Sequence, residues 1–289
     1  MKNKLIILSA ALLVSTLSVS SYAVDLDAGD YDAAPAGTHV ALLYLQHAKR
    51  DKLYHGSDQV AGNNELTSDI GIARFVHFTN IAGYRVAPQV LIPFGKLEAD
   101  QDVSHWGSSS GLGDLILAAP IWLLNDTDKK QYFGITPYLF LPTGEYSKND
   151  ALNLGENRYK LNLQAAFSTR LTPKIAWDVA ADATLYGDND DLAGGGKLKQ
   201  EVGYQIQTSG RYFLNEKTDL RAGLSYSDAG DTEIRGINAD STQQSKFWLG
   251  AAYSPTATTN LLLTYGQDIE VENGFKEDNR VNFRVLKVF

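Results

Sequence analysis

Apolar and polar side chains alternate along the stretch from Arg158 to Arg170. Successive side chains of a β-strand point to opposite faces, so one face of this stretch is apolar and the other is polar. The apolar face carries Tyr159, Leu161, Leu163, Ala165 and Phe167, and the polar face carries Arg158, Lys160, Asn162, Gln164 and Ser168. Strands of soluble proteins usually have about 5 or 6 residues, whereas a tilted strand needs about 9 to 11 to cross a bilayer. The pattern predicts a membrane strand with one face toward lipid and the other toward water.

The same alternation returns along most of the chain. Clear apolar stripes begin at Ile175, Val202, Leu220, Phe247, Leu261 and Val281, and less regular ones begin at Tyr84, Leu115 and Phe133. Residues 38–47 and 66–78 also suit strands, although their register is harder to assign. The total is about 12 strands, an even number as in bacterial single-chain barrels. We therefore predict an all-β fold, a transmembrane antiparallel up-and-down β-barrel.

One charge conflicts with this pattern. Arg74 shares its parity with Ile70, Ile72, Val76 and Phe78. A charge on the lipid face near the membrane midplane would cost about 2 to 4 kcal/mol. We therefore expect a bulge or a shifted register near Arg74.

The predicted connections alternate between short and long. Short turns are expected at residues 79–82, 125–130, 172–174, 215–218 and 254–259, and long polar loops at residues 49–65, 96–110, 145–157, 188–200, 228–242 and 272–279. In outer-membrane barrels short turns face the periplasm and long loops face outward, which would place both chain termini in the periplasm. Tyr159, Tyr204 and Tyr226 near the outer strand ends, with Phe167, Trp177, Tyr212 and Tyr253 near the inner ends, suit two interfacial aromatic girdles. A soluble β-sandwich or lipocalin-like barrel would also alternate, but strand length and the loop rhythm favour the membrane barrel.

The N-terminus has the pattern of a secretory signal peptide. Lys2 and Lys4 precede an apolar run over residues 5–14, which is too short to span a bilayer, and a Ser-rich stretch ends at Ala23. We predict cleavage after Ala23, which leaves residues 24–289 as one barrel domain in the outer membrane. Residues 24–36 would form a periplasmic or lumenal N-terminal segment. The formal net charge of −8 makes an exported nucleic-acid-binding protein a poor interpretation.

Sites for metals or for catalysis are not indicated. The chain has no cysteine, and its 5 histidines lack the spacing of a metal site. No cofactor is implied. A hydrolase at the outer rim would need His55 near Ser57, Asp51 and Asp58, or His105 near Ser104 and Asp102. Polar loop clusters of this kind are usually solvated, so we predict that the protein is not an enzyme.

Several short motifs carry a family resemblance. They are residues 25–31 (DLDAGDY), 35–38 (PAGT), 111–115 (GLGDL), 141–146 (LPTGEY) and 154–158 (LGENR). These motifs resemble the phenol-degradation (meta-pathway) family of bacterial outer-membrane proteins. The resemblance implies a barrel transporter for aromatic or other hydrophobic compounds. The terminal Phe289 also resembles the signal read by the outer-membrane assembly machinery, although Lys287 departs from that signal.

Charged residues predicted to face inward are the candidates for lining the lumen. They are Arg85, Asp114, Arg158, Lys160, Asp178, Asp182, Glu201, Arg211, Arg221 and Arg284. They could form a structural network in the barrel, or opposed basic and acidic ladders that orient a polar solute. A barrel of about 12 strands suits a narrow channel better than a wide pore. Residues 25–35 could enter the lumen as a plug, a hypothesis motivated by their motif.

These features predict a monomeric outer-membrane channel for passive uptake of small solutes. Its physical partners would be lipid and solute, with no nucleic acid. A narrow porin for anionic or sugar-like solutes is the first alternative, and an outer-membrane hydrolase is the second. A purely structural barrel that conducts nothing is a further possibility.

Overall fold

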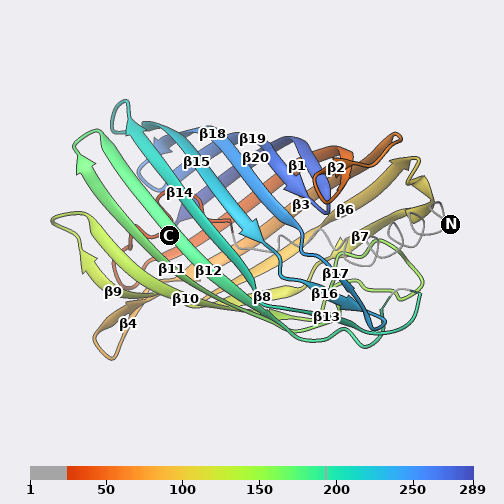
Figure 1. Ribbon diagram of the computed structural model, residues 1–289. Helices are drawn as coiled ribbons and strands as arrows, with labels where there is room; N and C mark the ends of the chain where they lie inside the picture. The colour runs from red at the N-terminus through yellow and green to blue at the C-terminus, as the bar shows by residue number, and fades with distance from the viewer. Residues whose placement is uncertain (1–24, 193) are drawn as a thin grey trace.

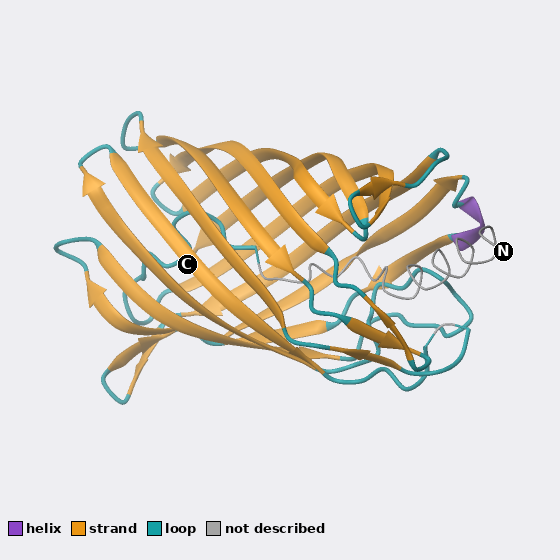
Figure 2. Ribbon diagram, viewed as in Figure 1, coloured by secondary structure: helices purple, strands orange, loops and turns teal. Residues whose placement is uncertain are grey.

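The computed structural model of the chain describes residues 25–192 and 194–289. These residues form a closed antiparallel β-barrel with 12 strand positions, strongly tilted relative to the barrel axis (Figures 1 and 2). The all-β barrel predicted from the alternating pattern is therefore confirmed. No helix among residues 25–192 and 194–289 is long and apolar enough to cross a membrane. The predicted signal peptide lies outside the described residues.

The wall follows the chain order from one strand to its neighbour. Uninterrupted strands of the wall are β1 (His39–His55), β3 (Asn64–His77), β10 (Gln131–Leu141), β11 (Lys160–Thr172), β12 (Ile175–Tyr186), β14 (Gly203–Phe213), β15 (Thr218–Asp228), β18 (Gln243–Thr256), β19 (Thr259–Glu272) and β20 (Phe275–Val288). Pairing of β1 with both β3 and β20 closes the barrel.

Two wall positions are built from several pieces. One combines β5 (Tyr84–Val86) with β6 (Gln89–Gln101), and β5 also forms a hairpin with β4 (Thr79–Ile81). The other combines β7 (Ser108–Leu112), β8 (Leu115–Ala118) and β9 (Ile121–Asp126). Pro88 lies between β5 and β6, and Pro120 lies between β8 and β9. Proline has no N–H to donate to the ladder, which accounts for the breaks at these positions.

The barrel has a turn end and a loop end. Short connections join β9 to β10, β11 to β12, β14 to β15 and β18 to β19 at the turn end. The chain also finishes there, because the N–H of Phe289 donates to the carbonyl of His39 at 2.9 Å. Long connections lie at the opposite end and contain β2 (Asp58–Gln59), η1 (Ser104–Trp106), β13 (Leu198–Gln200), β16 (Thr232–Ile234) and β17 (Ile237–Ala239) (Figure 1).

Three of the predicted long loops are wrong. Strands β1, β3 and β6 extend far into the segments expected to be loops at residues 49–65 and 96–110. The expected loop at residues 272–279 is a hairpin extension with a two-residue turn at Asn273–Gly274. Pairs such as Lys49 with Glu65 and Lys52 with Asp278 lie on these extensions. These charged side chains interrupt the apolar alternation, so the sequence pattern did not show that the strands continue beyond the apolar belt.

The two faces of β11 are as predicted. Leu161 and Leu163 are 46% and 51% exposed on the outside, whereas Lys160 is 3% exposed and Gln164 is fully buried inside. Exposed leucine, isoleucine, phenylalanine and valine side chains continue this apolar belt on the other strands. Predicted girdle residues Tyr159, Tyr204, Tyr226, Trp177, Tyr212 and Tyr253 are likewise exposed.

The expected bulge near Arg74 is wrong. The registers of β3 with β1 and with β6 run without a shift through Arg74. Its guanidinium points inward and donates to the Tyr44 hydroxyl at 3.0 Å. Val76 and Phe78 share this parity and are also buried inside. The interior beside β3 is itself apolar. The strand face that carries apolar residues at alternate positions therefore faces inward here and not toward lipid.

Candidate functional site

The N-terminal segment, residues 25–36, lies inside the barrel. Its Leu26 N–H donates to Gln207 of β14 at 2.9 Å, and its Tyr31 carbonyl accepts from Nε1 of Trp122 in β9 at 2.9 Å. Strands β9 and β14 belong to different parts of the wall, so the segment crosses the interior. Gly29 has a φ of +90°, and a Cβ there would lie 2.4 Å from Nη1 of Arg211. A glycine is therefore required where the segment turns against the wall.

Carboxylates of this segment pair with arginines of the wall. The closest oxygen–nitrogen distances are 2.8 Å for Asp25 with Arg280, 2.7 Å for Asp27 with Arg284, 2.9 Å for Asp30 with Arg74 and 2.7 Å for Asp32 with Arg211. Arg221 adds a hydrogen bond of 2.7 Å to the carbonyl of Ala28. These arginines come from β3, β14, β15 and β20, so the segment is bound from several sides.

Acids of the segment and of the wall share these arginines. On the wall, Arg211 lies 3.4 Å from Asp178, Arg221 lies 2.5 Å from Asp219 and Arg280 lies 2.8 Å from Glu277. Opposed basic and acidic groups therefore occur on the wall, and the segment adds a second set of acids. Arg74 and Arg280 were not among the candidates, because Arg74 followed an apolar parity and Arg280 falls between the expected loop at residues 272–279 and the stripe that begins at Val281. The aspartates at positions 25, 27, 30 and 32 were the available signal.

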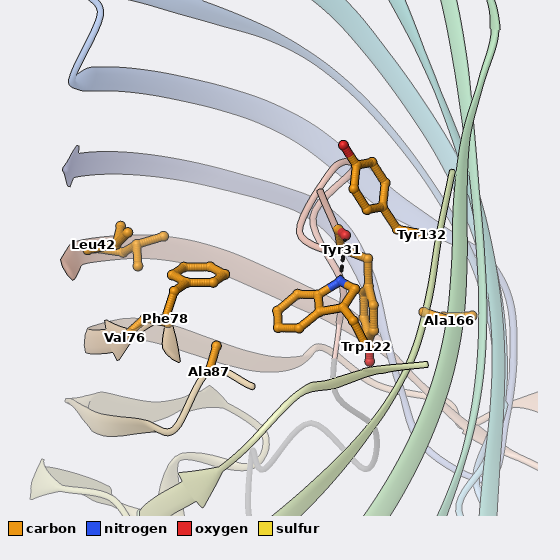
Figure 3. Close-up of a cluster of buried hydrophobic side chains, with 10 residues drawn as sticks. Tyr31, Leu42, Val76, Phe78, Ala87, Trp122, Tyr132 and Ala166 are labelled. Atoms are coloured by element: carbon orange, nitrogen blue, oxygen red, sulfur yellow. Dashed lines mark hydrogen bonds between the residues drawn. The ribbon is translucent and has the colours of Figure 1, made fainter. Parts of the chain in front are cut away.

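An apolar cluster lines the interior beside these ion pairs. Its buried members are Tyr31, Val40, Leu42, Val76, Phe78, Ala87, Trp122, Tyr132, Ala166 and Ala180 (Figure 3). The rings of Tyr31 and Trp122 have centroids 6.1 Å apart, and those of Phe78 and Trp122 are 5.7 Å apart. Aromatic rings of the segment and of the wall are therefore packed together inside the barrel, next to the arginines that bind the segment.

A second charged group lies toward the loop end. Glu156 accepts from Arg158 at 2.7 Å and also pairs with Lys160. All three side chains are nearly fully buried, and Arg158 also donates to Gln200 at 2.7 Å. Charge-assisted hydrogen bonds compensate for the burial of these groups. Two of the predicted lumen-lining bases therefore share one acid in the connection between β10 and β11, which offsets one of their two positive charges.

Asp114 anchors that same connection. Its carboxylate accepts from the N–H groups of Gly144 and Glu156, each at 2.9 Å. A Cβ on Gly144 would lie 2.6 Å from the carbonyl carbon of Gly113 and 2.9 Å from the Cα of Gly155. Three of the family-like motifs, at residues 111–115, 141–146 and 154–158, thus meet at one glycine-rich contact.

The loop end contains its own apolar cluster. Its buried members are Leu53, Leu66, Leu97, Ala99, Val103, Trp106, Leu152 and Phe275. Leu152 comes from the β10–β11 connection, and the other members come from β1, β3, β6, β20 and the η1 region. The extended strands and this connection therefore pack together at the loop end.

Other long connections are tied to one another. Strands β13, β16 and β17 form a small separate sheet over the buried Leu192, Leu198 and Ile234. The Tyr146 hydroxyl donates to the carbonyl of Asp191 at 2.9 Å. Hydrogen bonds to Asp188 and Asp190 raise the pKa of Lys197, whose ammonium group lies 2.6 Å from Asp188 and 2.9 Å from Asp190. These contacts order the loop end.

The remaining lumen candidates differ in position. Asp182 is buried and accepts from Asn162 at 2.7 Å. Arg85 is half-buried at the turn end and donates to the carbonyl of Ala34. Glu201 precedes the first residue of β14, and its side chain is exposed. It therefore lies outside the wall strand that was expected to carry it, and its place in the inward-facing set stays a prediction.

The suggested histidine clusters do not assemble into a catalytic pair. No hydrogen bond joins a histidine to a serine side chain within the described part of the chain, and His105 contacts the edge of Trp106 instead. Within the same residues, no group of 3 or more His, Asp or Glu side chains could hold a metal ion.

A closed barrel with an apolar outer belt and a polar, aromatic interior defines an outer-membrane channel fold. The family model described as "Putative MetA-pathway of phenol degradation" matches residues 49–285. The chain belongs to this family. An outer-membrane channel from Pseudomonas putida F1 is 38% identical, with a TM-score of 0.88 over 92% of this chain and 100% of that one. No curated protein sequence matches the chain.

More distant structures share the fold alone. The β domain of the Bordetella autotransporter BrkA is 10% identical, with a TM-score of 0.53 over 88% of this chain and 100% of that chain. A deletion mutant of the monoaromatic hydrocarbon channel TodX is 10% identical, with a TM-score of 0.50 over 88% of this chain and 90% of that chain.

Proposed function

We propose that this outer-membrane channel admits small aromatic compounds by passive diffusion. The observation that carries the proposal is the apolar cluster inside the barrel, which contains Phe78, Trp122 and Tyr132. Aromatic side chains inside a lumen attract aromatic solutes through apolar burial and ring contacts. The family match to phenol degradation and the fold shared with TodX, named a monoaromatic hydrocarbon channel, support the same solute class.

Charge pairing in the interior argues against the alternative of an anion-selective porin. Arg158 and Lys160 share Glu156, and Arg211 pairs with Asp32. A paired arginine attracts a passing anion less than an unpaired one, because the neighbouring carboxylate cancels most of its field. The hydrolase alternative has no hydrogen bond between a histidine and a serine side chain among the described residues to support it, and the His47–Asp69 hydrogen bond of 2.7 Å joins two exposed side chains away from the predicted clusters.

We infer the export and the membrane orientation of the protein from its sequence patterns. Residues 1–23 would direct export and be removed after Ala23. The turn end would face the periplasm and the loop end the exterior, as in other barrels with short turns and long loops. Phe289 would then be presented to the assembly machinery from the periplasmic side, and the mature chain would act as a monomer.

The N-terminal segment is proposed to restrict the channel. Its pairs with Arg74, Arg211, Arg280 and Arg284 hold it across the interior. A solute that passes along the barrel must move around this segment or displace it. We infer that the segment keeps the resting conductance low.

Planar-bilayer recording of the refolded protein tests the proposed function. Phenols added to either side should block the ionic current in a concentration-dependent way, while sugars of similar size should not. Equal block by sugars and phenols, or no block by either, would count against an aromatic channel. A Tyr159→Ala variant, altered only on the outer surface, provides the matched control.

A further inference from the structure

We propose that the pocket filled by the Tyr31 side chain is a binding site for a phenolic solute, with Tyr31 as its intramolecular occupant. This inference rests on the proposed function and narrows its solute class from aromatic compounds to phenols. Three features of the pocket support it. The pocket has a flat space that fits an aromatic ring, it offers a polar partner for a hydroxyl group, and its lining residues belong to the barrel wall and not to the N-terminal segment.

The barrel wall leaves space for the aromatic ring of Tyr31. Tyr31 is only 3% exposed and packs within the apolar cluster against Trp122 (Figure 3). Gly134 of β10 lies beneath it, and a Cβ there would come within 3.0 Å of Cε1 of the Tyr31 ring. The backbone carbonyl of Ile121 would be 2.9 Å from the same Cβ, so the wall could not easily move aside. A glycine at this position therefore leaves room for a flat ring.

Polar groups of the barrel wall lie close to the hydroxyl group of Tyr31. The Tyr31 hydroxyl lies 2.5 Å from Oγ1 of Thr136 and 3.5 Å from Oε1 of Gln164. Both wall side chains are fully buried. Buried polar groups are costly without a partner, so a ligand that lacks a hydroxyl group should bind this pocket more weakly.

The pocket belongs to the barrel and not to its occupant. Trp122, Gly134, Thr136 and Gln164 are residues of β9, β10 and β11. By contrast, Tyr31 lies on a segment fixed by noncovalent contacts, among them the pairs of Asp30 with Arg74 and Asp32 with Arg211. If these contacts open, the wall retains a site with the shape and polarity of a phenol.

A truncation of the occupant should reveal the site. Tyr31→Ala removes the ring but keeps the backbone carbonyl that Trp122 contacts and the flanking aspartates. Apolar cavities made in this way can bind small aromatic molecules. The suitable probe is 4-methylphenol, which is the tyrosine side chain itself, and toluene is the same molecule without the hydroxyl group.

Isothermal titration calorimetry of the full-length folded protein in detergent micelles compares these probes. Tyr31→Ala should bind 4-methylphenol at least about tenfold more tightly than it binds toluene. The wild-type protein and Tyr31→Phe should bind at least about tenfold more weakly than Tyr31→Ala, because their rings fill the pocket. Wild-type protein in the same micelles also corrects for partitioning of the probes.

A second substitution identifies the hydroxyl partner. In the Tyr31→Ala background, Thr136→Val should remove the preference for 4-methylphenol over toluene. Absence of binding by folded Tyr31→Ala, or equal binding of both probes, would overturn the inference. If Tyr31→Ala does not assemble, Tyr31→Val retains more packing than alanine, leaves most of the space of the ring empty and permits the same comparison.

These results are separable from the proposed function. Block of the wild-type current by phenols, together with no binding to Tyr31→Ala, would refute this site while leaving the aromatic channel intact. Tight binding to Tyr31→Ala without any block or uptake would support the site and refute the channel.

Discussion

The carboxylate of Asp32 lies 2.7 Å from Nη1 of Arg211, although 179 residues separate the two positions in the chain. Arg211 is buried in the wall, whereas Asp32 belongs to the segment inside the barrel. The pair therefore joins the proposed plug to the lumen wall. The interior depends on such long-range pairs for its charge balance.

Asp32→Asn should loosen the segment. The substitution removes one ion pair whose carboxylate is partly exposed, so we expect a loss of about 1 kcal/mol in the free energy that holds the segment in place. That loss corresponds to a roughly fivefold increase in the population of open channels. Single-channel recording measures the open probability. Asp126→Asn, at the last residue of β9, where the carboxylate pairs with Lys129 of the adjacent turn, should leave that probability unchanged.

Leu163→Arg should impair assembly. Leu163 is 51% exposed on the outer face of β11, and a charge near the midplane of the bilayer costs about 2 to 4 kcal/mol. Heat-modifiable gel migration and urea titration of the folded barrel measure the effect. Tyr159→Arg, at the residue that precedes the same strand, should cost about 0 to 1 kcal/mol. Equal destabilisation by both substitutions would contradict the assignment of the membrane face.

Lys160→Gln should leave the barrel folded and change its ion selectivity. Glu156 would retain Arg158 as a partner, with their atoms 2.7 Å apart, so the buried carboxylate remains compensated. Loss of one positive charge should move the reversal potential toward cation selectivity in a salt gradient. Lys129→Gln, in an exposed turn, is the control and should not move it. An unfolded Lys160→Gln variant would show that the residue is structural alone.

Gly144→Ala should detach the β10–β11 connection from the wall. The new Cβ would lie 2.6 Å from backbone atoms of Gly113, which is closer than packing allows. We expect limited proteolysis to cleave residues 142–159 at least about fivefold faster than in the wild type, which corresponds to about 1 kcal/mol of local stability. Gly210→Ala is the matched control, since its Cβ would meet nothing closer than 3.9 Å. Similar cleavage rates for the two variants would contradict this packing.

The sequence predicted the barrel well where its interior is polar. Along β11, lipid on one side and charged or amide groups on the other produce a clean alternation, so Leu163 and Lys160 were assigned to the correct faces. The first strands behave differently because Val76 and Phe78 line an apolar interior. Alternation then no longer separates lipid from lumen, and Arg74 was misread as a conflict.

The site was only partly predictable for a related reason. Inward charges such as Arg211 and Arg284 could be found by parity, because each strand fixes which side chains turn inward. Their partners could not, since the pairs with Asp32 and Asp27 depend on how a segment without regular structure crosses the barrel. No local spacing encodes that path.

The most direct test of the central claim is the uptake of radiolabelled phenol by Gram-negative cells that express or lack this protein. Measurement at low phenol concentration keeps the outer membrane rate-limiting, and cells expressing the assembly-defective Leu163→Arg variant serve as the control. An aromatic channel should raise the initial uptake rate only in cells with the wild-type barrel. Equal initial rates in all three strains would contradict the account.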